Sequence, residues 1–98
     1  MNPTRNVVWQ VSEGSRLLWK SWDDEYVVFD DGSGYTHVLD LVAGEVLKVL
    51  EEAPADPSQL TRRVASRLDL TPDPELVGRV QETIRKFHEV GLVEPTLS

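Results

Sequence analysis

The chain has 98 residues, of which 40% are hydrophobic and none is cysteine, so one small domain without disulfides or thiolate metal ligands is expected. The net charge of −7 argues against a general attraction to nucleic-acid phosphates. No apolar run approaches the ~18 residues of a membrane span, and residues 1–6 lack the apolar run of a signal peptide, so a cytoplasmic protein is predicted.

The first forty residues predict a flexible arm followed by a small sheet. The arm covers residues 1–8, and weak alternation over residues 7–11 is typical of a strand or of an extended arm. Runs of β-branched and aromatic residues predict three strands, over residues 17–22, 25–29 and 35–39. The last two strands are joined by Asp30–Gly34, whose glycines and local hydrogen-bonding side chains favour a hairpin loop.

Three helices are predicted after the sheet, at about residues 41–52, 57–68 and 74–90. Each follows an aspartate that is able to cap its first turn, namely Asp40, Asp56 or Asp73. The fold class is therefore α+β, in a single domain over residues 1–98 with the sheet in 17–40 and the helical layer in 41–91. The short segment 92–95 is interpreted as a tail.

The helices differ in how much of their surface is apolar. In the first, apolar residues cover a wide arc, and Glu45, Lys48 and Glu52 are expected on the opposite side. In the third, the apolar stripe consists of Leu76, Val77, Val80, Ile84, Phe87 and Val90. We expect Leu76, Val80 and Phe87 to be core residues and Ile84 to lie nearer a groove.

Charges and tryptophans each allow two interpretations. Six of the ten basic residues lie between positions 62 and 86, either as a solvated face or as a surface for an acidic partner. The tryptophans at 9, 19 and 22 either cover a sheet too small to bury its own faces or form a stacking platform for a ligand. Packing is the simpler explanation for the tryptophans.

The sequence offers little for catalysis or metal binding. His37, Asp40 and His88 can in principle meet, but zinc usually takes three or four protein ligands, so neither a metal nor another cofactor is expected. No serine lies in a strand-to-helix elbow, and the segment 32–34 precedes a strand rather than the helix of a phosphate-binding loop. Binding is the remaining option: if Tyr35–Leu39 is an edge strand, it can accept another strand beside the third helix.

Four short motifs follow one another along the chain, namely Arg16–Trp19, Trp22–Val28, Thr36–Asp40 and Phe87–Val93. In their order, over roughly residues 9–95, they resemble the PqqD-like peptide chaperones, the recognition elements of ribosomal peptide modification. The subgroup that they resemble most is the one associated with HPr-kinase-related gene clusters, the HPr-rel-A system.

This resemblance implies a winged-helix-like fold in which a leader peptide lies beside the third strand and against the third helix. Carried over to this chain, the implied peptide-binding residues are Tyr35, Thr36, His37 and Val38 on the strand, and Val77, Gln81, Ile84 and His88 on the helix.

The first functional hypothesis is a non-catalytic adaptor that presents a substrate or leader peptide to a separate modifying enzyme or HPr-kinase-related protein from the same gene cluster. A second hypothesis is a winged-helix nucleic-acid binder that uses the basic residues between 62 and 86. The negative net charge and the absence of a predicted β-wing after the third helix argue against it. A third is a structural subunit that docks on a kinase-like partner.

Overall fold

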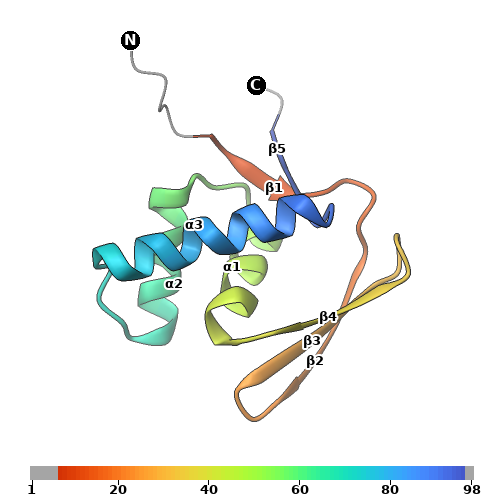
Figure 1. Cartoon of the computed structure of the whole chain (residues 1–98), viewed down its shortest axis with the longest axis horizontal. Coiled ribbons are helices and arrows are strands. Elements are labelled where there is room, and N and C mark those ends of the chain that lie inside the picture. The colour runs from red at the N-terminus through yellow and green to blue at the C-terminus, as the bar shows by residue number, and fades with distance from the viewer. Residues whose placement is uncertain (1–6, 97–98) are drawn as a thin grey trace.

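The computed structural model describes residues 7–96, which form two small sheets and three helices (Figure 1). Of the predicted flexible arm at 1–8, residues 1–6 lie outside this range, while the Val8 carbonyl accepts a hydrogen bond from the Thr96 N–H at 2.8 Å. The elements are β1 (Trp9–Val11), β2 (Leu17–Trp22), β3 (Glu25–Asp30), β4 (Tyr35–Leu39), α1 (Leu41–Glu52), α2 (Pro57–Leu68), α3 (Pro74–Glu89) and β5 (Val93–Pro95).

The main sheet is antiparallel with the order β2-β3-β4, which confirms the three predicted strands. A two-residue turn joins β2 to β3, and its first residue, Asp23, has a positive φ of 45°. The loop between β3 and β4 closes with Gly34 at φ 84°, a conformation that glycine adopts without steric cost. The α+β class, with a three-stranded sheet followed by three helices, is confirmed.

Asp30 ends β3 as a buried residue and organises the loop around it. Its carboxylate accepts hydrogen bonds from the backbone N–H groups of Arg16 and Gly32 at 3.1 and 2.9 Å, and from the hydroxyls of Ser15 and Ser33 at 3.2 and 3.1 Å. Burial alone would raise the pKa of Asp30, but these four hydrogen bonds outweigh burial and lower the pKa. The predicted loop residue is therefore a fixed anchor between β2, β3 and the loop.

A second, two-stranded sheet pairs β1 with β5, at the two ends of the described chain. Trp9 lies opposite Pro95, and Trp9 also exchanges backbone hydrogen bonds with Ala55 at 2.9 and 3.0 Å. The segment interpreted as a tail is thus a paired strand. Because β5 pairs with β1, the strand that follows α3 does not form the hairpin of a β-wing.

The three predicted caps are present at the helix starts. Asp40 and Asp73 accept hydrogen bonds from the third residue beyond each, at 2.8 and 2.9 Å. Asp56 forms a full capping box with Gln59, with bonds of 2.8 and 3.0 Å. Local sequence therefore sets where each helix begins.

The core lies between the sheet and the helices. Its fully buried side chains include Val28, Val46, Leu47, Leu60, Val64 and Val80. Leu76, Val80 and Phe87 are buried as predicted, but Ile84 is buried as well, and the expectation that it lies nearer a groove with β4 is wrong. The reason is that this flank of α3 packs toward β1 rather than toward the main sheet.

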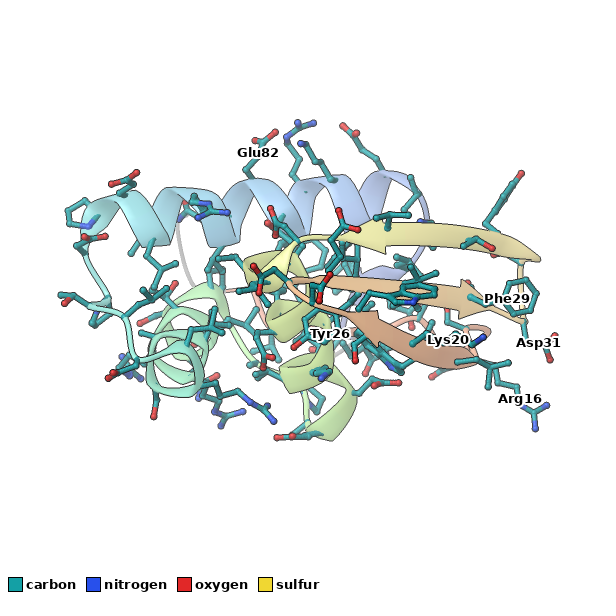
Figure 2. All side chains as sticks on the ribbon, turned by 90° about the horizontal axis from the view of Figure 1, so that it is seen from below. Arg16, Lys20, Tyr26, Phe29, Asp31 and Glu82 are labelled. Carbon is teal, nitrogen blue, oxygen red and sulfur yellow. The ribbon has the colours of Figure 1, made fainter. Side chains whose placement is uncertain are left out.

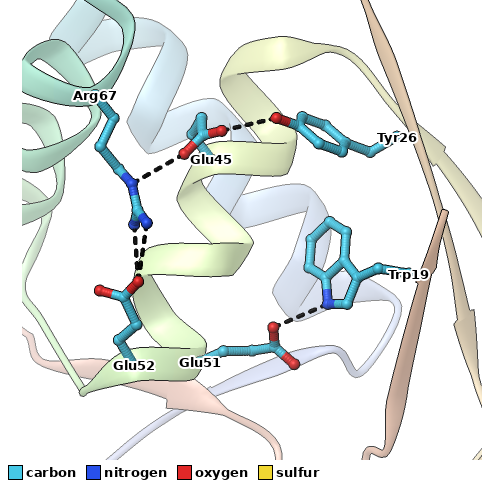
Figure 3. A network of polar contacts seen from close by, with 6 residues as sticks. All are labelled: Trp19, Tyr26, Glu45, Glu51, Glu52 and Arg67. Atoms are coloured by element: carbon cyan, nitrogen blue, oxygen red, sulfur yellow. Dashed lines mark hydrogen bonds and ion pairs between the residues drawn. The ribbon is translucent and has the colours of Figure 1, made fainter. Parts of the chain in front are cut away.

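A polar network joins β2 and β3 to α1 and α2 (Figure 3). Tyr26 donates from its hydroxyl to Glu45 at 2.8 Å, and Arg67 contacts both Glu45 at 3.1 Å and Glu52 at 2.9 Å. Trp19 donates from its indole N–H to Glu51 at 2.9 Å. Glu45 was predicted on the solvent side of α1, but its side chain is buried because the Tyr26 hydroxyl and the Arg67 guanidinium satisfy its charge.

Candidate functional site: a groove beside an open sheet edge

The strand β4 forms one edge of the main sheet, and its hydrogen-bonding direction follows from its neighbours. The N–H of Asp31, the residue just after β3, donates to the carbonyl of Arg16, the residue just before β2, at 2.8 Å and therefore points to the β2 side. Successive strand residues direct their backbone polar groups to alternate sides, so those of Val28 point the other way, toward β4. The register places His37 opposite Val28, so the backbone polar groups of His37 face into the sheet.

The residues on either side of His37 consequently have the opposite orientation. The N–H and C=O groups of Thr36 and Val38 point away from β3, at an edge to which no strand of the described chain pairs. Unpaired strand groups of this kind are a template for an added strand. The edge therefore offers two donors and two acceptors in extended geometry.

A groove of about 460 Å³ lies beside this edge, with α3 as its other wall. Figure 2 shows α3 running alongside β4. The groove is lined by Thr36, His37, Val38, Leu39 and Asp40 from the strand side, by Ala43 from α1, and by Thr83, Lys86, Phe87 and Val90 from the α3 side. Its lining includes the apolar residues Leu39, Phe87 and Val90 beside an open backbone edge, and strand addition of an extended peptide uses both features.

The groove carries an asymmetric charge. At one end Asp40 forms an ion pair with Arg79 at 3.4 Å. On the α3 wall Lys86 is exposed, and no ion pair found among residues 7–96 involves it. The charge that the groove offers to a ligand is therefore the Lys86 ammonium, which favours a ligand with a carboxylate.

The structure separates the predicted peptide-binding residues into two groups. Thr36, His37 and Val38 line the groove, whereas Tyr35 is exposed at the start of β4. On the helix, none of the four predicted residues lines the groove. Gln81, Ile84 and His88 line a different hollow of about 250 Å³, together with Trp9, Pro57 and Arg85, and Val77 is half-buried.

The α3 residues that line the groove lie on the other flank of the apolar stripe from the four predicted helix residues, whose peptide-binding role stays a prediction. Thr83, Phe87 and Val90 recur at helical spacing, so the sequence does place them on one face. Either flank of a stripe is compatible with that spacing alone. The choice depends on Trp9, whose ring contacts His88 edge-on with 5.0 Å between ring centroids and occupies the other side of α3.

The two histidines do not meet. His37 lies in the groove and His88 against Trp9, and no group of three or more His, Asp or Glu side chains within residues 7–96 is arranged to hold a metal ion. Within the same residues no helix is long and apolar enough to cross a membrane.

Comparisons with known proteins identify a family and a similar fold. The model of the family described as coenzyme PQQ synthesis protein D (PqqD) matches residues 25–93. A solved structure, described as TbiB1 in complex with the TbiA(beta) leader peptide, is similar in fold, with a TM-score of 0.66 at 19% sequence identity, covering 91% of this chain and 99% of that one. A search of curated proteins gave no match. Since the family model covers well over half of the chain, this protein belongs to the PqqD family of peptide-binding adaptors.

Proposed function

We propose that this chain holds a leader or substrate peptide by β-strand addition to β4 and presents it to a separate modifying enzyme. The observation that carries the proposal is the outward-facing backbone of Thr36 and Val38 next to a groove whose far wall is α3. Main-chain hydrogen bonds of this kind supply affinity for any extended peptide, while pockets for alternate side chains supply specificity.

The strand register determines how a bound peptide would lie. Peptide residues that pair with Thr36 and Val38 direct their side chains to the same face as those two residues, away from the helices. The peptide residue between them, opposite His37, directs its side chain toward α3, where Phe87 and Val90 form the wall. An apolar residue is favoured at this inward position, and a carboxylate within reach of Lys86 adds electrostatic attraction.

The proposed partner is a modifying enzyme or an HPr-kinase-related protein encoded in the same gene cluster. The support for a partner of this kind is the resemblance of the motifs at Arg16–Trp19 and Thr36–Asp40 to the HPr-rel-A subgroup. A nucleic-acid-binding role has weaker support, because Arg67, Arg79 and Arg85 form ion pairs with acidic neighbours of the chain itself.

Two arginine substitutions on opposite flanks of α3 test the location of the site. Thr83→Arg places a long side chain in the groove, whereas Gln81→Arg places the same side chain beside Trp9. The probe is a fluorescein-labelled peptide covering the leader segment of the precursor encoded beside this gene, and the readout is fluorescence polarisation.

We expect Thr83→Arg to weaken peptide binding by about tenfold or more, since a blocked hot-spot region typically costs over 1 kcal/mol, and Gln81→Arg to leave binding nearly unchanged. The reverse result would place the peptide in the hollow beside Trp9, on the flank of α3 that holds the helix residues implied by the resemblance. If the wild-type chain binds neither this peptide nor the remainder of the precursor, the proposed function is wrong.

A further inference from the structure

The face of the main sheet that points away from the helices carries a row of apolar side chains. Because strand residues alternate, the side chains at the even positions of β2 and β4 and at the odd positions of β3 point away from the face that holds Trp19 and Val28. We call the apolar residues among them the outer patch, which consists of Leu18 and Trp22 from β2, Val27 and Phe29 from β3, and Val38 from β4. Lys20 lies between Leu18 and Trp22 on the same face. Three members of the outer patch are more than half exposed: Leu18 at 57%, Trp22 at 54% and Val38 at 65%.

The described helices do not cover the outer patch. Figure 1 shows α1, α2 and α3 gathered on the other side of the main sheet, where Val28 and Leu39 enter the core. Figure 2 shows Phe29 and Lys20 on the part of the sheet that extends away from the helices. Contiguous exposed apolar side chains on a small domain mark an interaction surface, whereas single ones are ordinary.

We propose that the outer patch is the docking surface for the modifying enzyme, an inference that depends on the proposed function. The patch is continuous with the peptide edge through Val38, which belongs to both. A peptide strand added to β4 places the side chains opposite Thr36 and Val38 on this same face. An enzyme that covers the outer patch therefore contacts the adaptor and the bound peptide on one continuous surface.

The rim of the outer patch indicates the chemistry of the partner. Asp23 and Glu25 lie at one end of the sheet beside Trp22, whereas at the other end Asp31 lies next to Arg16. The acidic part of the rim is therefore the Trp22 end, and a complementary surface has an apolar centre with lysines or arginines that face this end. A second copy of this chain is a less suitable partner for the outer patch, because its own rim carries the same acidic residues and its net charge is also −7.

The experiment uses the full chain, the labelled leader peptide and the purified modifying enzyme from the same gene cluster. The test variant is Leu18→Gln/Trp22→Gln, and the matched control is Leu70→Gln, which alters an exposed apolar residue on the connector between α2 and α3. Enzyme binding is measured by isothermal titration with and without peptide, and peptide binding by fluorescence polarisation. We expect the test variant to bind peptide within about twofold of wild type while binding the enzyme at least tenfold more weakly, and the control to resemble wild type.

A second variant distinguishes the enzyme from a second copy of the chain. Asp23→Asn/Glu25→Gln removes two rim charges, and asparagine tolerates the positive φ of position 23. Docking on a basic-rimmed enzyme should weaken, most clearly at low salt, whereas self-association measured by sedimentation would strengthen.

Normal enzyme binding by both variants would overturn the docking proposal. A wild-type dimer that Leu18→Gln/Trp22→Gln converts to a monomer would assign the outer patch to self-association instead and likewise overturn it. If the wild-type chain binds the enzyme but not the peptide, and the outer-patch substitutions weaken enzyme binding, the result counts against the peptide function alone.

Discussion

The aromatic ring of Tyr26 occupies the space in which a side chain at position 44 would stand. A Cβ built on Gly44 would overlap three ring atoms of Tyr26, so the glycine in the first turn of α1 is what allows β3 to approach this helix. The same ring also lies under the Lys48 ammonium, 4.2 Å from the ring centroid, and its hydroxyl is bound to Glu45. The contact between β3 and α1 therefore depends on the absence of a side chain at position 44.

We predict that Gly44→Ala destabilises the domain although alanine is the better helix former. The helix preference favours alanine by about 1 kcal/mol, but the new methyl displaces the Tyr26 ring, and overpacking of this kind typically costs about 1–3 kcal/mol. The control is Gly78→Ala on α3, where a Cβ meets nothing within 4 Å and the helix preference should give a small gain in stability. Urea denaturation of both variants checks the prediction, and a stabilised Gly44→Ala would contradict the tight contact.

We further predict that Asp30 makes folding sensitive to acid. Its hydrogen bonds lower its pKa in the folded state, so the unfolded chain binds the proton more tightly. The stabilisation is complete above the unfolded aspartate pKa of about 3.9 and is lost as the pH falls through the lower folded value. Asp30→Asn keeps the shape and should cost about 1–2 kcal/mol at neutral pH, with the difference from wild type shrinking below pH 4.

Denaturant unfolding at several pH values measures this difference. Asp31→Asn is the matched control, because Asp31 is the exposed neighbour and a substitution there should change the free energy of unfolding by less than about 0.5 kcal/mol. An Asp30→Asn chain that stays less stable than wild type by the same amount at every pH would show that the carboxylate charge is not the cause.

A third prediction concerns Phe87, which is buried but borders the groove. Phe87→Ala should lower the free energy of unfolding by about 3–5 kcal/mol, a large part of the roughly 5–15 kcal/mol that domains possess. Val90→Ala, at an exposed position one helical turn further, should cost much less. Thermal melting of the two variants tests the orientation of α3, and a Phe87→Ala midpoint within a degree or so of wild type would show that the helix is turned differently.

The parts of the fold that local sequence determines were predictable. The helix starts are set by Asp40, Asp56 and Asp73, because a cap acts within three residues of the chain. The hairpin loop could be predicted because Gly34 supplies a backbone conformation that few residues adopt. The strand β4 was also predictable from its own residues, whereas its position at the edge of the sheet was only a condition of the functional hypothesis.

The features that depend on distant contacts were not predictable. The pairing of β1 with β5 joins segments at opposite ends of the described chain, and each is only three residues long, too short for a pattern. The burial of Glu45 depends on Tyr26 and Arg67, which lie on other elements. The flank of α3 that faces β4 is fixed by rotation of the helix about its own axis, and Trp9 occupies the flank that the resemblance had suggested.

The last prediction separates the two sides of β4 by proline substitution. Proline removes the backbone donor and is tolerated in sheets mainly where that donor is unpaired. His37→Pro removes a donor that faces Val28 and should unfold the domain or destabilise it strongly. Thr36→Pro and Val38→Pro remove donors that face away from the sheet, so both variants should keep their fold and yet lose affinity for the leader peptide.

The comparison of the three variants is informative because each introduces proline into the same strand and they differ only in position. Melting curves report the fold of each variant, and polarisation of the labelled peptide reports binding. Stability and affinity should change at alternate positions, which a general disturbance of the strand would not produce. If Thr36→Pro and Val38→Pro unfold the chain as His37→Pro does, β4 is not free on its outer side. If they fold and bind peptide as well as the wild type, the peptide does not add to this edge as a strand.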